Sequence, residues 1–254
     1  MIKTLFTTMG LVASVFALTM CSGTSERKIN AQMETIPVDS ALDLLPNDGY
    51  AEELKPYSEE LSRTMDEVIG YAPHGLKAYQ PESPLSNWSA DVLREAAIDY
   101  IGAPADIGVV NMGGLRCEIP AGDVTLRKMY ELMPFDNQLT IVWLTGADLD
   151  SLCQGFAAYG GQGVSGLTFC ISASRAHNIC VQGQPLDPLA TYSVATNDYL
   201  VAGNDGMESL TRHTKRVDTG MTIRDIYIKA VKQTTANGTD LMAELEGRLT
   251  FCAE

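Results

Sequence analysis

Apolar residues recur every three or four positions in several parts of the chain, a spacing that predicts amphipathic helices. We expect the aromatic and aliphatic side chains of these helices to lie in a core, because a helix of this kind buries its apolar face. The predicted helices cover Tyr50–Val68, Trp88–Tyr100, a short segment that starts at Thr125, Asp148–Phe156, and Ile223–Val231, which Thr222 caps.

Short apolar runs that end in turn residues predict strands. They lie at Ile107–Val110, Leu139–Leu144, Leu167–Ile171, Asn178–Gln182, Thr191–Thr196 and, as an edge strand, Leu249–Phe251. Helices come first, strands and helices then alternate irregularly, and no internal repeat is visible. This order predicts an α+β fold: a single domain over residues 49–254, with a mixed β-sheet and packed helices.

The first 20 residues have the pattern of an export signal: Lys3 precedes an apolar run, Leu5–Met20, that is too short to span a membrane. The run ends in Leu-Thr-Met-Cys, which resembles a bacterial lipoprotein cleavage box with Cys21 as the lipidated residue; ordinary signal cleavage nearby is the alternative. Residues 21–48 lack periodicity and are predicted to be a tether. We therefore expect an exported, periplasmic or outer-membrane-anchored lipoprotein that touches the membrane through its lipid alone.

Composition limits the partners. An apolar fraction of 45% is enough for a hydrophobic core. The net charge of −14 argues against a nucleic-acid polymer or an anionic membrane surface as partner, because both are bound by clustered cations. A small anion can still bind through one local arginine.

The cysteines indicate a disulfide rather than a metal site. Five remain if Cys21 carries lipid, so they cannot all pair. Cys170 and Cys180 flank a predicted hairpin, which makes them the candidate bridge. The sequence has no C-x-x-C pair, so a structural zinc site has little support.

The stretch Val109–Asn137 carries the candidate chemistry. A strand end is followed by Gly113 and Gly114, which would let a ligand approach bare backbone. Arg116 adds a planar fork of donors suited to carboxylate, phosphate or vicinal hydroxyls. Phe135, in a loop that follows a proline, offers a flat apolar face. A polar cradle beside an aromatic ring suits a nucleoside.

Two ordered blocks of this sequence are similar to a known family. The first reads N-x-G-G-L-R from Asn111, then IPAGDVT from Ile119 and P-F-x-N from Pro134; the second reads YSVATNDY from Tyr192, then AGNDG from Ala202. Together they resemble the C-terminal, substrate-binding domain of the 5′-nucleotidase family, and the likeness covers residues 49–254. The resemblance implies that the ligand is a nucleoside or nucleoside monophosphate.

The resemblance also implies a role for each site residue. Two aromatic rings sandwich the base, an amide bonds its edge, a carboxylate takes the ribose hydroxyls, and an amide and a guanidinium lie beside the ribose and phosphate. In this chain the matching residues are Phe135 and Tyr199, Asn137, Asp205, and Asn111 with Arg116. For the two rings, ordinary core packing is the alternative.

Departures from the family pattern fall mainly on the phosphate side. Tyr199 stands where phenylalanine is commoner, and Asn204 replaces a glycine but is expected to tolerate a left-handed backbone. The family carries an arginine upstream of a motif that Glu82–Trp88 resembles; here Tyr79 is the nearest match, with Lys77 close by. Base and ribose contacts are thus better preserved than phosphate contacts.

Family members normally carry a separate N-terminal metallophosphoesterase domain with two metal ions. Such hydrolysis needs a dense set of Asp, His and Asn ligands, and none of His74, His177 and His213 lies in a ligand motif. We therefore predict no catalytic residue, no metal ligand and no cofactor in this chain, and assign divalent metals to a partner metallophosphoesterase chain. Three hypotheses follow: the substrate-binding part of a split 5′-nucleotidase, a free-standing envelope nucleoside- or nucleotide-binding module, or a relic domain kept for structure.

Overall fold

The computed structural model describes residue 35 and residues 49–252. The predicted export signal, Cys21 and nearly all of the tether therefore lie outside the described residues. Among the described helices, none is long and apolar enough to cross a membrane.

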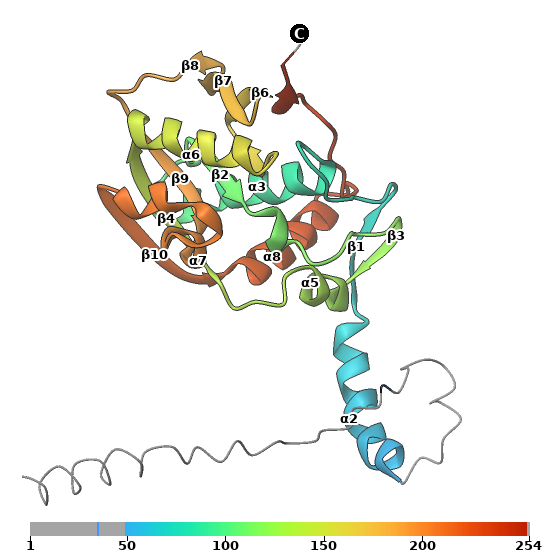
Figure 1. The fold of residues 1–254 in the computed structure, drawn as a ribbon. Helices are drawn as coiled ribbons and strands as arrows, with labels where there is room; N and C mark the ends of the chain where they lie inside the picture. The colour runs from blue at the N-terminus through green and yellow to red at the C-terminus, as the bar shows by residue number, and fades with distance from the viewer. Residues whose placement is uncertain (1–34, 36–48, 253–254) are drawn as a thin grey trace, which may run out of the picture. The chain divides into compact units, whose positions relative to one another are not determined.

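A five-stranded mixed sheet forms the centre of the domain (Figure 1). Its order is β10-β4-β9-β2-β5. Strand β2 runs parallel to β9, whereas the other neighbouring strands are antiparallel. The strands are β2 (Ile107–Val110), β4 (Gln138–Thr145), β5 (Gly163–Ser165), β9 (Thr191–Asn197) and β10 (Lys215–Thr222).

Helices cover both faces of this sheet, because its central strands are apolar on both sides. On β4, Ile141 packs into one core cluster and Val142 into the other, as alternation along a strand requires. Helices α3 (Pro84–Ala96) and α8 (Ile223–Ala236) fill the first side, where the rings of Trp88 and Tyr227 lie 5.0 Å apart. Helix α6 (Gly146–Ala158) fills the second.

A second, four-stranded sheet packs beside α6. Its order is β11-β6-β7-β8, with β11 at the edge and parallel to β6. The strands are β6 (Leu167–Ser172), β7 (Arg175–Val181), β8 (Gln184–Pro185) and β11 (Leu249–Phe251).

The remaining elements are short apart from one helix. A two-stranded ribbon pairs β1 with β3, and four helices complete the described chain. These elements are α2 (Tyr50–Met65), β1 (Val68–Ala72), α4 (Ile98–Ile101), β3 (Gly122–Thr125), α5 (Leu126–Leu132) and α7 (Asp198–Val201), with 3-10 turns at Met112–Gly114, Asn204–Gly206 and Glu208–Arg212. The predicted α+β class, with a mixed sheet and packed helices, is confirmed.

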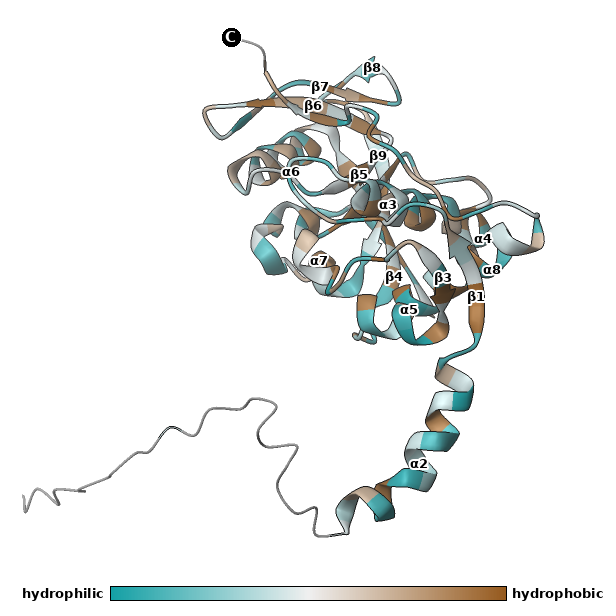
Figure 2. Cartoon of the chain, turned by 90° about the vertical axis from the view of Figure 1, so that its right-hand side faces the viewer, coloured by the Kyte–Doolittle hydropathy of each residue, from teal (hydrophilic) through white to brown (hydrophobic). Residues whose placement is uncertain are grey.

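The first predicted helix is present in the structure, but the prediction that its apolar side chains lie in a core is wrong. Its stripe is exposed: Tyr50, Leu54, Tyr57 and Leu61 are all more than half accessible. Figure 2 shows hydrophobic and hydrophilic residues side by side along α2. The helix also ends before Val68, which instead begins β1.

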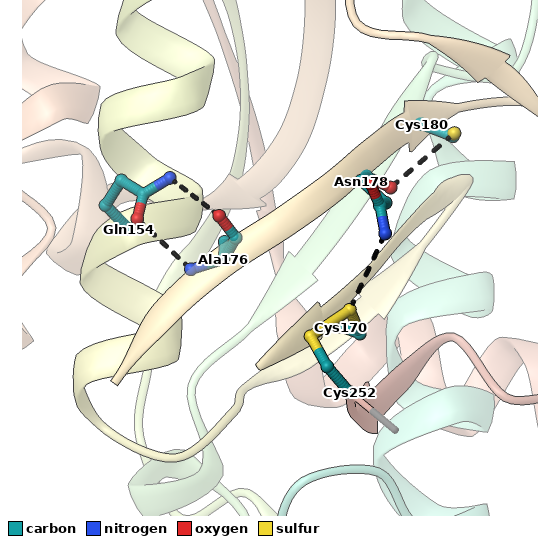
Figure 3. The surroundings of a disulfide bond; sticks show 6 residues. All are labelled: Gln154, Cys170, Ala176, Asn178, Cys180 and Cys252. Carbon is teal, nitrogen blue, oxygen red and sulfur yellow. Dashed lines mark hydrogen bonds between the residues drawn. A yellow bond between two sulfur atoms is a disulfide. The ribbon is translucent and has the colours of Figure 1, made fainter. Parts of the chain in front are cut away.

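The predicted disulfide is wrong, because Cys170 bonds Cys252 and not Cys180 (Figure 3). A register shift in the β6–β7 pair places Cys180 opposite Thr168 and Cys170 opposite His177, so the two cysteines are not cross-strand partners. On the other side of β6, β11 brings Cys252 to within 4.9 Å of Cys170 between Cα atoms, a normal distance for a disulfide. The sequence contains no pattern that would reveal this parallel pairing.

Candidate ligand-binding site

Three neighbouring strands deliver polar residues to one edge of the central sheet. Parallel strands β2 and β9 both end there, at Val110 and Asn197. Strand β4 is antiparallel to β9 and begins there, since Leu139 lies opposite Asn197. Loops that follow or precede these strand ends therefore converge, although they are distant in the sequence.

A cavity of about 360 Å³ lies at this edge, within the range of small-molecule sites. All six residues predicted to contact a ligand line it. The complete lining is Asn111, Gly113, Gly114, Arg116, Met133, Phe135, Asn137, Asn197, Tyr199 and Asp205. The convergence is a finding of the structure, while the individual roles toward a ligand stay predictions.

The two aromatic rings are not core residues. The exposed fraction is 39% for Phe135 and 41% for Tyr199. The guanidinium of Arg116 lies 5.9 Å from the centroid of the Phe135 ring and donates to the carbonyl oxygen of Gly113. Exposed rings beside a cavity are available to stack on a flat apolar ligand.

Asp205 is held by two donors from different segments. The side-chain amide of Asn111 donates to Oδ2 at 2.6 Å, and the hydroxyl of Tyr199 donates to Oδ1 at 2.9 Å. The hydrogen bond to Asp205 raises the pKa of Tyr199, so this phenol stays protonated across the neutral range. A carboxylate has about four acceptor positions, so Asp205 keeps capacity for ligand hydroxyls.

Local backbone geometry supports the hydrogen bonds of Asp205, both near Asn111 and in the loop that carries Asp205. A Cβ on Gly114 would lie 2.7 Å from Oδ1 of Asn111, so a side chain there would displace the Asn111 amide. In the loop after α7, the left-handed backbone falls on Gly203, Asp205 and Gly206. Asn204, which we expected to tolerate such a backbone, does not adopt it, and its side-chain amide donates to the carbonyl oxygen of Tyr199. The departure at this position is thus compatible with the loop.

Sequence reasoning missed two lining residues, Met133 and Asn197. Asn197 caps α7 by accepting from the backbone N–H of Leu200. Its place at the end of β9, one residue before the next helix, was the available signal. Met133 is the buried first residue of the loop that carries Phe135, and nothing in its local pattern separates it from an ordinary core methionine.

The lining of the cavity carries little positive charge. Among the described residues that line it, Arg116 is the one positive side chain. Tyr79 and Lys77 do not line the cavity, and the amine of Lys77 lies 3.6 Å from the carboxylate of Glu118.

The motif at Glu82–Trp88, by contrast, has a structural role. Glu82 is buried and accepts from the amide of Asn87 and from the backbone N–H of Glu246. It thereby fastens a late segment of the chain to α3.

The donor set of the described residues does not fit a metal centre. No group of three or more His, Cys, Asp or Glu side chains in this part of the chain could hold a metal ion. His74 is exposed in the bend after β1, His177 is exposed on β7, and a ring nitrogen of His213 lies 2.8 Å from the carbonyl oxygen of Leu210.

Fold and cavity together define an α+β domain with a cavity of small-molecule size at the edge of its mixed sheet. The chain belongs to the family described as 5′-nucleotidase, C-terminal domain, whose model matches residues 68–212. The resemblance noted in the sequence is therefore correct.

Relatives and solved structures agree. The chain is 29% identical over 238 residues to the trifunctional nucleotide phosphoesterase protein YfkN of Bacillus subtilis, covering 83% of this chain and 16% of that protein. It is 24% identical over 219 residues to a 5′-nucleotidase of Vibrio cholerae, covering 81% and 38% respectively. The 5′-nucleotidase precursor of Thermus thermophilus superposes with a TM-score of 0.71 at 28% identity, over 84% of this chain and 45% of that one. The chain thus spans less than half the length of these proteins.

Proposed function

We propose that this domain is the substrate-binding part of a 5′-nucleotidase that acts in nucleotide catabolism and holds a nucleoside or nucleoside monophosphate in the cavity at the sheet edge. The observation that carries the proposal is the convergence of Phe135, Tyr199, Asp205 and Arg116 on one cavity. Two rings suit the base, a carboxylate suits the ribose diol, and a guanidinium suits the phosphate.

Hydrolysis, in this proposal, takes place on a separate metallophosphoesterase chain that brings the divalent metals. The described residues offer no fitting metal ligands, so the chemistry assigned to this chain is binding and orientation. Phe135 and Tyr199 would fix the plane of the base, and Asp205 would fix the ribose. Holding the substrate in one orientation toward the metals lowers the entropy lost on reaching the transition state.

Binding is tested first. Isothermal titration calorimetry of the chain with adenosine and adenosine monophosphate should give saturable heats. Replacing Phe135 with Ala should weaken both ligands by about 1–3 kcal/mol, the value of one base–aromatic stack. The nucleoside site would be refuted if Phe135→Ala bound both ligands as tightly as the wild-type chain, or if the wild-type chain bound neither.

Catalytic assistance is tested second. A metallophosphoesterase chain encoded by the same organism, supplied with Mn²⁺, is mixed with this chain and with adenosine monophosphate. Phosphate release should rise when both chains are present and should fall again with Phe135→Ala. If the chain binds nucleotides but never raises phosphate release, it is instead a non-catalytic binding lipoprotein of the envelope.

The cellular address is part of the same proposal. We expect Cys21 to be lipidated after export, placing the domain in the periplasm or at the outer membrane. Metabolic labelling with a palmitate analogue should mark the full chain and not the Cys21→Ser variant. Equal labelling of both, or a labelled chain found only in the cytoplasm, would refute it.

A further inference from the structure

One short loop, Met133–Asn137, supplies three of the residues that line the cavity. It connects the end of α5 to the start of β4. Phe135 is 39% exposed within it, so its own ring is only partly packed. The contacts that hold the backbone of the loop therefore also contribute to the position of the ring.

Arg224, in the first turn of α8, holds the loop. One terminal nitrogen of its guanidinium, Nη1, lies 3.3 Å from the carbonyl oxygens of both Met133 and Phe135. The other, Nη2, donates to the carboxylate of Asp136 at 2.6 Å. The guanidinium also lies 4.4 Å from the centroid of the Tyr130 ring, on the helix that precedes the loop.

The neighbouring residue of α8 fixes the far end of the same loop. The backbone N–H of Ile223 donates to the carbonyl oxygen of Asn137 at 2.9 Å. Ile223 itself is fully buried, and Thr222 caps the helix by accepting from the N–H of Asp225. The first turn of α8 is therefore rigidly placed, and it contacts the loop on both sides of Phe135.

The position of Arg224 is unusual for an arginine. A cation in the first turn of a helix is opposed by the positive end of the helix dipole. The side chain is also only 12% exposed, and its Nε has no partner among the described residues. The contacts to the loop offset these costs, which points to a role in tertiary structure rather than in helix formation.

We propose that Arg224 is a positioning residue for the ligand site. Its hydrogen bonds to the loop backbone and to Asp136 hold the segment that carries Phe135, and thereby orient the Phe135 ring. This inference rests on the proposed function for its ligand but not for its geometry. It assigns α8, which contributes no residue to the cavity lining, a part in base recognition.

The first experiment compares two ligands. Arg224→Ala should weaken adenosine about tenfold, within the range for one lost stacking face, and should leave ribose 5-phosphate within about twofold, since that ligand has no base to stack. Arg224→Lys should fail to restore binding because an ammonium lacks the planar fork that reaches two carbonyls. Asp136→Asn should have a small effect, since that side chain is 84% exposed.

The matched control is Arg216→Ala, which removes another arginine–aspartate pair on β10. It should leave both affinities unchanged. Equal loss of both ligands in Arg224→Ala would overturn the proposal by showing a general defect, and unchanged adenosine binding would overturn it directly.

The second experiment needs no ligand. The protein is labelled with 4-fluorophenylalanine, and the Phe135 resonance is assigned with Phe135→Leu. In Arg224→Ala the Phe135 resonance should shift or broaden while those of buried Phe156 and Phe169 stay in place. An unchanged Phe135 resonance would overturn the positioning role. If the unchanged protein binds no adenosine, the proposed function fails while this readout still decides the role of Arg224.

Discussion

Tyr199 joins a stacking face to the carboxylate beside it, because its hydroxyl donates to Asp205. Tyr199→Phe keeps the ring and removes that donor, so it separates the two effects. We expect affinity for a ribonucleoside to fall about threefold to tenfold, the value of one hydrogen bond, and affinity for a 2′,3′-dideoxynucleoside to stay unchanged. Calorimetry with adenosine and 2′,3′-dideoxyadenosine measures both. Unchanged affinity for both ligands would mean that Tyr199 acts through stacking alone, and an equal loss for both would mean that its hydroxyl does not act through the ribose hydroxyls.

We expect Arg116 to be the residue that distinguishes a nucleotide from a nucleoside. Its guanidinium lines the cavity and donates to the carbonyl oxygen of Gly113 through Nη1, so other donors remain for a phosphate. Arg116→Ala should therefore weaken adenosine monophosphate by about 1.5–3 kcal/mol, as for a hydrogen bond to a charged group, and adenosine by less. Comparison of the two dissociation constants tests this. Equal losses would place Arg116 near the base rather than the phosphate.

The N-terminus of helix α6 should lose stability as the pH falls. The carboxylate of Asp148 accepts from Arg212 and from the hydroxyl of Thr145, and these bonds lower its pKa. A group with a depressed folded pKa stabilises the fold above its unfolded pKa and loses that effect as pH falls through the folded value.

Asp148→Asn should therefore be less stable than the unchanged chain from neutral pH down to about pH 5. The difference should shrink below about pH 4, near the ordinary pKa of aspartate. Urea unfolding at several pH values measures it. A difference that stays constant down to about pH 2, below the ordinary aspartate range, would show that the carboxylate charge is not the cause.

Local sequence patterns predicted many helices and strands, but they did not predict which distant segments pair with one another. Strands β2, β4 and β9 of the central sheet and helix α8 follow from runs and stripes that neighbouring residues determine. Strands β5 and β10 were not predicted, because neither contains a sustained apolar run. The partner of Cys170 does not, because β11 reaches β6 from 82 residues away. The six site residues could be named because each lies in a family motif; Arg224 lies in none, and only the fold shows which loop it holds. The stripe of α2 has helical spacing, yet spacing alone does not say whether an apolar face is covered.

At the scale of the whole molecule, the Cys170–Cys252 bond should contribute to stability because it closes a long loop. For a separation of 82 residues, the loss of unfolded-chain entropy corresponds to about 4.5 kcal/mol. Cys252→Ser should lower the free energy of unfolding by up to that amount, whereas Cys180→Ser, which removes a free thiol, should change it little. Chemical denaturation of both variants measures the two losses of stability. A larger loss in Cys180→Ser than in Cys252→Ser would mean that Cys180 is the true partner of Cys170.

The pairing of β11 with β6 has a consequence for the preparation of the protein. Nearby, Arg248 donates to both carboxylate oxygens of Asp91 and to the carbonyl oxygen of Val164. A chain that lacks Leu249–Phe251 leaves one backbone edge of β6 unpaired, and such edges recruit other chains. A shortened product without β11 should therefore aggregate, and the quality of preparations should depend on an intact C-terminal segment.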